Sequence, residues 1–345
     1  MITNNPYYDE LPRDVLELMH SSVFCEYASL NAQGLAIDTP TFAFMPADSR
    51  SLDVATGLAY PVKAERARRN PRVGLLLEGL PGEPIVAISA LAAVRDASIQ
   101  ANADRYIAET IAYYDSYAYG HPWSAGRKAV YYWARIFVQC TPQKIYWWPS
   151  AAHLNEPPQQ WLAATDTEFP KSDPAPSTGP SRVPAWSVHD WRTRAREMQA
   201  TGLGAHLSVV DDAGFPMPIR VSAATPNDEG FELVVPRGVP WRIAGPATLS
   251  YVGLATFVGK VLSAAGRVRF QVERILPTLP TVQDPREIWT PSAATYAGLM
   301  GRLEEELARR GQPLPQIPEI APTPTEGSLR RAQRMQRIAA LTPGG

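Results

Sequence analysis

Residues 54–77, VATGLAYPVKAERARRNPRVGLLL, combine the end of a strand, a short loop, a charged helix and a second strand. We expect the helix over residues 62–69, because Pro71 disfavours helical backbone just before it. Lys63 would then lie in the first helical turn, where backbone N–H groups lack partners and carry partial positive charge. The segment therefore predicts an anion site, with phosphate as the natural ligand.

Short apolar strands continue on both sides of this segment. We expect strands at 23–30, 35–44, 51–56, 73–77, 85–94 and 135–146, and helices at 14–19 and 104–114. Asn31 to Gly34 supply the turn of a hairpin between the first two strands. Short strands without regular βα alternation predict β-barrels rather than a doubly wound sheet.

The same order of elements recurs later in the chain. Residues 26–41 align without a gap on residues 206–221, which places Gly34 on Gly214, and the following strands pair in the same order. The repeat predicts two related barrels that pack as a dimer within one chain. A chance likeness between two β-meanders is the alternative.

Two proline-rich stretches divide the 345-residue chain, which holds 34 Pro. We expect a first split β-barrel at 1–150, a linker at 151–187, a second, degenerate barrel at 188–288 and a helical tail at 289–345. The tail carries amphipathic patterns at 300–310 and 328–341. The predicted fold class is α+β, mainly β with helices: two tandem split β-barrels and a C-terminal helical tail.

Composition argues against several classes of protein. A net charge of −1 gives no global attraction to nucleic acid, and the absence of 18 consecutive apolar residues argues against a membrane span. Two cysteines make no disulfide framework, and five histidines show no metal-ligand spacing, so we predict no metal site. A polar N-terminus favours a cytoplasmic protein.

The segment KAERARRNPRVGLLL, residues 63–77, resembles the signature of the pyridoxamine 5′-phosphate oxidase-like, FMN-binding split β-barrels. In that family Lys-Ala or Lys-Val opens a helix, and Asn-Pro-Arg-Val precedes an apolar strand. Residues 34–44 are similar to the family's second strand and residues 135–149 to its closing strand. The resemblance covers about residues 15–150, and 195–280 more weakly. It implies an FMN-dependent oxidoreductase acting on a small planar organic substrate between the barrels.

The resemblance also implies the members of a cofactor site. Lys63 would hold the phosphate, with Tyr60 beside it in the preceding loop. Arg220 of the second unit would reach the phosphate or else lie at an outward-facing position of its strand, and Trp241 would cover the site as partner subunits do in dimeric family members. The isoalloxazine ring and ribityl chain would be lined by Ile37, Asp38, Thr39, Val54, Ala55 and Thr56. No catalytic side chain is assigned, because a flavin carries the chemistry itself.

Several alternatives stay open. Pro61 stands where family members commonly carry Ser or Thr, which leaves a deazaflavin or haem as other cofactors, and a non-catalytic flavin- or haem-binding protein as another function. Arg66 is read as part of a solvated face or as a second phosphate contact. His121 is a structural residue or an acid, base or axial ligand. The chain is a monomer with paired barrels or a homodimer.

The aromatic-rich run between Tyr106 and Tyr146 also has two interpretations. Tyr and Trp offer flat apolar faces with a polar atom, which suits a planar ligand. The run therefore predicts either a wall for an aromatic substrate or packing between the two barrels.

Overall fold

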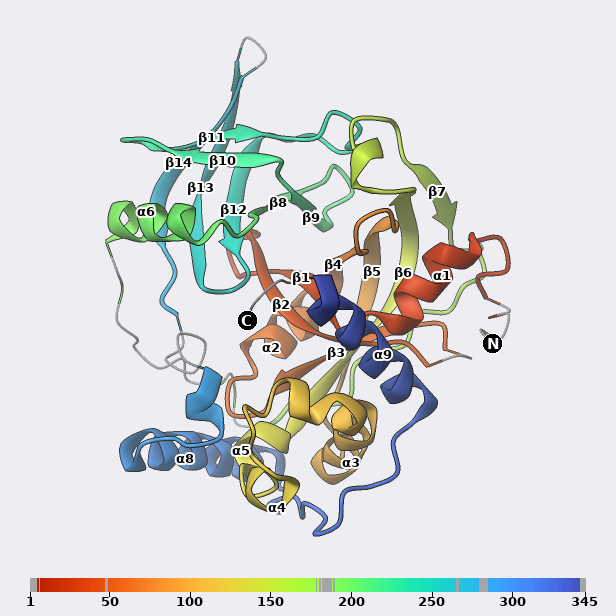
Figure 1. Ribbon diagram of the computed structural model, residues 1–345, viewed down its shortest axis with the longest axis vertical. Coiled ribbons are helices and arrows are strands. Elements are labelled where there is room, and N and C mark those ends of the chain that lie inside the picture. The colour runs from red at the N-terminus through yellow and green to blue at the C-terminus, as the bar shows by residue number, and fades with distance from the viewer. Residues whose placement is uncertain are drawn as a thin grey trace.

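The computed structural model describes residues 5, 7–46, 49–177, 179, 181, 188, 190–264, 267–278 and 285–341. Within them two antiparallel sheets lie one above the other, and most helices surround the lower sheet (Figure 1). None of the helices described is long and apolar enough to cross a membrane.

The first sheet forms a closed barrel. Its strand order is β3-β2-β1-β4-β5-β6-β7, and β3 also pairs with β6, which closes six strands into a ring. The strands are β1 (Phe24–Leu30), β2 (Ala36–Phe44), β3 (Leu52–Gly57), β4 (Arg72–Glu78), β5 (Ile85–Arg95), β6 (Arg135–Trp148) and β7 (Gln159–Leu162). Its interior is filled by Val, Leu, Ile and Ala side chains from alternating positions.

The second sheet repeats this order but stays open. Its order is β10-β11-β14-β13-β12-β8-β9, and β8, β9, β11, β12, β13 and β14 stand where the first barrel has β1 to β6. The strands are β8 (His206–Val210), β9 (Pro216–Arg220), β10 (Ala223–Pro226), β11 (Gly230–Val234), β12 (Gly245–Tyr251), β13 (Ala255–Ala264) and β14 (Arg267–Ile275). Strand β10 pairs with β11 at the edge where β9 would close the ring. The predicted α+β fold with two barrels is confirmed.

The two first hairpins show the repeat at the level of single hydrogen bonds. Asn31 Oδ1 accepts from the backbone N–H groups two and four residues later, and Asp211 Oδ1 does the same in the second barrel. Gly34 and Gly214 complete these turns with φ of 76° and 84°, a conformation that glycine adopts without steric cost. The gap-free alignment of the two hairpins therefore reflects equivalent geometry.

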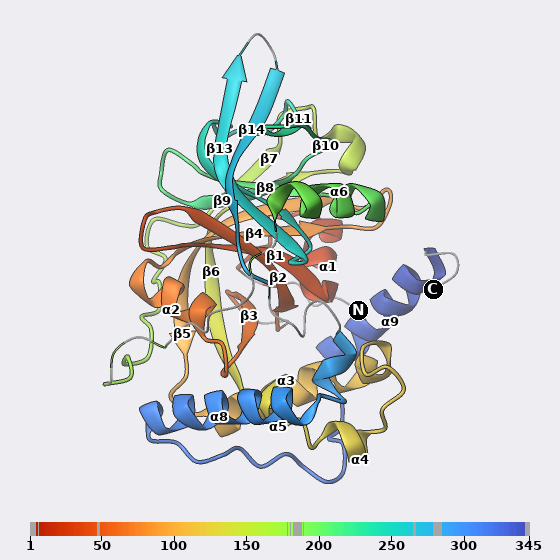
Figure 2. The ribbon, with the colours of Figure 1, turned by 90° about the vertical axis from the view of Figure 1, so that its left-hand side faces the viewer.

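Helices pack mainly against the first barrel (Figures 1 and 2). They are α1 (Arg13–Ser21), α2 (Val62–Arg69), α3 (Ile99–Thr110), α4 (Trp123–Gly126), α5 (Val130–Trp133), α6 (Trp191–Thr201), α8 (Ala293–Arg310) and α9 (Glu326–Leu341), with 3₁₀ turns η1 (Ile111–Ser116), η2 (Ala151–His153) and η3 (Pro285–Ile288). Helix α3 begins earlier than the expected residue 104, because the Ser98 hydroxyl caps it by accepting from the Ala101 N–H.

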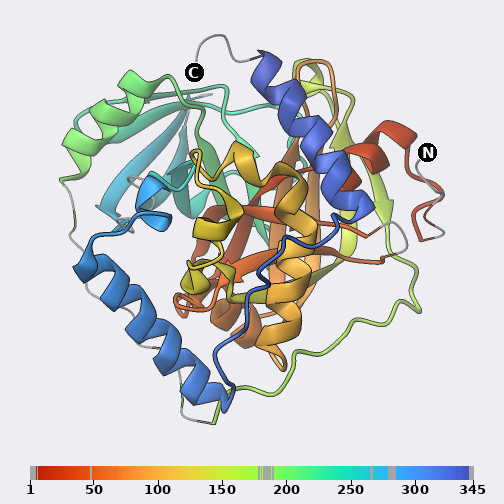
Figure 3. The ribbon, with the colours of Figure 1, turned by 60° about the horizontal axis from the view of Figure 1, so that its bottom comes forward.

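The C-terminal helices join the core of the first barrel. Leu299, Leu303 and Leu307 of α8 belong to the apolar cluster that fills that barrel. Helix α9 runs beside α1 and α3 (Figure 3). In the segment expected to be a linker, β7 extends the first sheet and the Asp173 carboxylate pairs with Arg95 at 3.0 Å.

One part of the aromatic-rich run packs on the outside of the first barrel, whereas Tyr131, Tyr132 and Tyr146 of the run reach the region between the barrels. Tyr106, Tyr114 and Trp133 form an apolar cluster on the outside of the first barrel, together with Phe44 and Phe137. Trp289, just after η3, packs against this cluster. The run therefore joins the C-terminal segment to the barrel surface.

Candidate cofactor-binding site

A cavity of about 520 Å³ lies between the two barrels. The first barrel contributes β2, the end of β3, the start of α2 and the start of β6, while α5 and α8 close one side. The second barrel contributes the β12–β13 turn and the residues after β14. This volume is in the usual range for small-molecule pockets, which often lie between domains.

Six of the predicted site residues line this cavity. Two come from the β3–α2 loop and from α2, and four come from β2 and β3. They are Ile37, Asp38, Thr39, Thr56, Tyr60 and Lys63. Val54 instead points into the core of the first barrel, and Ala55 contacts the aromatic cluster. The side chains of a strand alternate between its two faces, so Ala55 lies on the opposite face from Thr56, whereas Val54 shares the face of Thr56 but packs in the barrel core.

The two residues predicted from the second barrel lie elsewhere. Arg220 Nη1 is 3.3 Å from Glu78 Oε1 in an ion pair. Trp241 is buried in the core of the second barrel, with its ring centroid 5.7 Å from that of Tyr146. Neither lines the cavity; the second barrel instead contributes Val252, Gly253 and Thr256.

Three cations converge on the cavity wall. Lys63 and Arg66 lie one turn apart on α2, and Arg135 begins β6. The Arg135 guanidinium lies between the rings of Tyr106 and Tyr132, at 4.4 and 4.2 Å from their centroids, and its buried Nε has no hydrogen-bond partner. Among the described residues no carboxylate forms an ion pair with these three groups.

Burial of this cationic wall changes its proton affinity. Burial, together with the nearby charges of Arg66 and Arg135, lowers the pKa of Lys63 to about 8. Burial also lowers the pKa of Arg66 to about 10. Since desolvated like charges repel one another, an anionic ligand that neutralises them would bind favourably.

The N-terminus of α2 adds backbone donors to the same wall. Pro61 occupies the N-cap position with φ −79° and offers no side-chain hydrogen bond to the first turn. Val62 and Lys63, whose N–H groups lie in that turn, both line the cavity. Unpaired N–H groups and the helix dipole therefore act together with the three cations.

Aromatic side chains form another part of the wall. Tyr60, Tyr131 and Tyr132 line the cavity, and the Tyr131 hydroxyl donates to the Ile288 carbonyl at 2.7 Å. Burial raises the pKa of Tyr60 and Tyr131, so both phenols stay neutral near pH 7. Flat apolar walls beside a cationic end suit a planar ligand that carries an anionic group.

Sequence reasoning expected the aromatic run as one possible wall without naming its residues, and it missed Arg135 and the second-barrel part of this wall. Tyr131 and Tyr132 belong to the aromatic run that was interpreted only as a whole, and Arg135 was read as the first residue of a closing strand. His121, considered as an acid, base or axial ligand, does not line the cavity.

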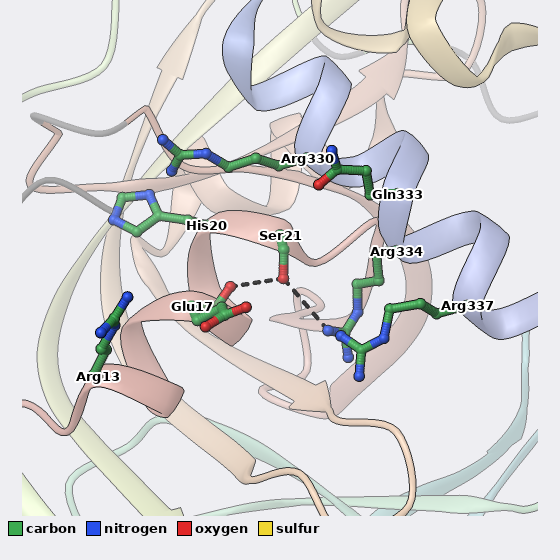
Figure 4. A pocket seen from close by; sticks show the side chains of 8 residues that line it. All are labelled: Arg13, Glu17, His20, Ser21, Arg330, Gln333, Arg334 and Arg337. Carbon is green, nitrogen blue, oxygen red and sulfur yellow. Dashed lines mark hydrogen bonds between the residues drawn. The ribbon is translucent and has the colours of Figure 1, made fainter. Parts of the chain in front are cut away.

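A smaller cleft of about 310 Å³ lies between α1 and α9 (Figure 4). It is rich in arginine, but Arg334 and Arg337 both pair with Glu83, at 2.8 and 2.6 Å. Arg334 Nη1 also lies 3.4 Å from Ser21 Oγ of α1 (Figure 4). These contacts attach α9 to the barrel, and we assign the cleft a structural role.

Comparisons with known proteins were made by sequence and by structure. No family model and no curated protein matches the chain. Solved structures match part of it. A pyridoxamine 5′-phosphate oxidase-related, FMN-binding protein from Nostoc punctiforme is 11% identical, covering 41% of this chain and 84% of that one at a TM-score of 0.30.

Two further structures match with similar sequence identity, coverage and TM-score. A protein of the pyridoxinephosphate oxidase family from Clostridium acetobutylicum is 10% identical over 43% of this chain and 92% of its own, with a TM-score of 0.31. An FAD-binding protein from Mesorhizobium loti is 15% identical over 40% and 94%, with a TM-score of 0.29. The first two of these structures carry the name of a pyridoxamine or pyridoxine phosphate oxidase family.

Proposed function

We propose that the chain binds FMN in the cavity between its barrels and uses it to transfer a hydride or electrons to or from a small planar organic substrate. The observation that carries this proposal is the convergence of Lys63, Arg66 and Arg135 on one aromatic-walled cavity. An FMN molecule combines a phosphate dianion with a flat ring system, so it matches both parts of the wall.

The residues present fit this cofactor. Lys63, Arg66 and the first-turn N–H groups of α2 would hold the phosphate, because they lie together at one helix end and line the cavity. Tyr131 and Tyr132 would flank the ring and exclude water from it. Bound flavin supplies the redox chemistry, whereas the protein binds it, orients it and shapes the space left for the substrate.

Deazaflavin and haem remain the competing cofactors. A deazaflavin also carries an anionic tail, so the same cations would serve it, and only a binding measurement separates the two. Haem commonly takes an axial histidine. None of the described residues that line the cavity is a histidine, which favours a flavin.

The first experiment is an absorbance spectrum of the purified full-length protein, followed by titration with FMN, a deazaflavin and haem in turn. We expect the two visible bands of a bound flavin and stoichiometric FMN uptake. A protein that binds none of the three would overturn the proposal. If the protein takes up FMN but its reduced flavin is not oxidised by quinone, nitro or enone acceptors, the chain is a flavin-binding protein and not an enzyme.

Three variants test the assigned phosphate contacts. We expect Lys63→Met and Arg66→Met each to weaken FMN binding at least tenfold, since a charge-assisted hydrogen bond to phosphate contributes more than about 1.4 kcal/mol. Arg69→Met is the matched control, because Arg69 is an exposed arginine of the same helix that does not line the cavity. Equal affinities for all three variants would place the phosphate elsewhere.

A further inference from the structure

A buried polar group lies behind the cavity, where the two barrels meet. Glu26 of β1, Asp38 of β2 and His206 of β8 are 7%, 0% and 4% exposed, and one ligand atom from each lies within 4.8 Å of the other two. Asp38 also lines the cavity, so this group adjoins open space. Carboxylate and imidazole are the ligands that divalent first-row metals take in proteins.

The atoms that face one another in this group lack partners. Both carboxylate oxygens of Asp38, Oε2 of Glu26 and Nδ1 of His206 have no partner at full hydrogen-bond geometry, although the Glu26 and Ser208 side chains and the Thr39 backbone lie close to the Asp38 carboxyl group. Nδ1 lies 3.4 Å from Glu26 Oε1 without the geometry of a hydrogen bond. Buried polar atoms are normally paired, and two adjacent buried carboxylates are especially costly without a positive charge. Three buried residues with unpartnered polar atoms, each offering a ligand atom within 4.8 Å of the others, indicate a missing ligand.

The imidazole is already oriented as a metal ligand would be. His206 Nε2 lies 2.8 Å from Glu78 Oε2, and Arg220 Nη1 lies 3.3 Å from the other oxygen of Glu78. A carboxylate at one ring nitrogen fixes the N–H there and leaves a lone pair on the other nitrogen. That lone pair belongs to Nδ1, the atom directed at Glu26.

We propose that Glu26, Asp38 and His206 bind one divalent first-row metal ion, such as Zn²⁺ or Mn²⁺, at the barrel interface. Two carboxylates and a neutral imidazole balance the charge of such an ion, which removes the repulsion within the buried group. Asp38 lies between this group and the cavity, so an ion would enter from the cavity side by a local opening around Asp38. The ion would tie β1 and β2 of the first barrel to β8 of the second.

Metal binding to the full-length chain tests this site directly. The purified protein is stripped with a chelator, left free of flavin, and titrated with Co²⁺ as a coloured probe and then with competing Zn²⁺. We expect one ion per chain, visible d–d bands and a rise in melting temperature on binding. Because no flavin is present, the outcome does not depend on whether the chain binds FMN.

Isosteric variants separate ligation from folding. Asp38→Asn and Glu26→Gln keep shape but remove charge, and we expect each to lose more than 100-fold in metal affinity while the metal-free proteins are at least as stable as the parent, because the repulsion between the two acids is removed. Glu78→Gln, which disturbs only the orientation of His206, should weaken binding about 10–100-fold. His206→Gln removes the third proposed ligand. Its matched control is His121→Gln, which should bind the metal as the parent does.

Two results would overturn the proposal. One is the absence of stoichiometric metal uptake by folded parent protein under these conditions. The other is uptake that persists with unchanged affinity in both Asp38→Asn and Glu26→Gln, which would place the ion elsewhere. In either case a proton shared between the two carboxylates would explain the group instead.

Discussion

Glu26 and His206 occupy equivalent positions in the two barrels, and their side chains face each other across the barrel interface. Each lies eight residues before the glycine of its hairpin turn, Gly34 or Gly214, and the Glu26 Oε1 to His206 Nδ1 distance is 3.4 Å. In a symmetric pair of barrels the same residue would meet itself at this point. The two halves of this chain instead place an acid opposite an imidazole, a pairing that a homodimer cannot make.

The lowered pKa of Lys63 predicts how flavin binding depends on pH. Below pH 8 the ammonium is charged and the affinity for FMN should be constant, because the pKa is about 8 in the free protein. A bound phosphate raises that pKa, so affinity should fall up to about tenfold per pH unit above 8. Fluorescence titration from pH 6.5 to 9.5 measures this. A slope that persists in Lys63→Met would assign the effect to another group.

The same group predicts the sign of a stability change in the flavin-free protein. Between about pH 8 and 10.5 the unfolded chain keeps the Lys63 proton that the folded chain has lost. The unfolded state then binds more protons, so the free energy of unfolding should rise with pH through this window. Lys63→Met should remove that rise. Urea unfolding at pH 8 and pH 10 compares the two proteins.

Gly74 tests the contact between the barrels. A Cβ at this position on β4 would lie 1.7 Å from the Pro216 carbonyl oxygen of β9, so the second barrel must move away. We expect Gly74→Ala to lower the free energy of unfolding by about 3 kcal/mol. Gly301→Ala in α8 is the control, because a Cβ there meets nothing within 4 Å, and it should stabilise by about 0.5–1 kcal/mol. Equal effects would contradict this interface.

A buried ion pair attaches α9 to α3. Arg331 is 1% exposed and donates to the Glu109 carboxylate, and its guanidinium also lies 4.9 Å from the Phe44 ring centroid. Arg331→Met leaves a buried acid without its partner, so we expect a loss of about 3–5 kcal/mol. The double variant with Glu109→Gln should recover part of that loss in denaturant unfolding. Strictly additive effects of the two changes would show that the pair is not coupled.

The β12–β13 turn holds a strained residue at the cavity wall. Val252 has φ of 47°, a left-handed conformation that β-branched residues rarely adopt and that Asn tolerates. We therefore expect Val252→Asn to raise the free energy of unfolding by about 1 kcal/mol. Val234→Asn, at an exposed site of β11, is the control and should not stabilise the protein. A loss of stability in Val252→Asn would contradict the strained turn.

Local sequence patterns were sufficient to predict the strands of the barrels and helix α2. Alternating apolar strands and the Asn31–Gly34 turn follow from period-two burial and from turn chemistry, both of which act within a few residues. Helix α2 was expected at 62–69 and is found there. The start of α3 was missed because its position depends on one capping hydroxyl, that of Ser98. Of the candidate site, the part contributed by β2 and α2 could be predicted, since those elements share one signature.

Contacts between distant segments were decided only by the tertiary structure. Arg135, Tyr131 and Val252 reach the cavity because β6, α5 and the β12–β13 turn converge there, and no spacing along the chain encodes that convergence. The same holds for Asp38 and His206, which are far apart in sequence and adjacent only because the barrels pack face to face. Local sequence patterns specified the strands, the repeat and helix α2. The packing of one barrel on the other decided which side chains share a site, because burial and charge act through space.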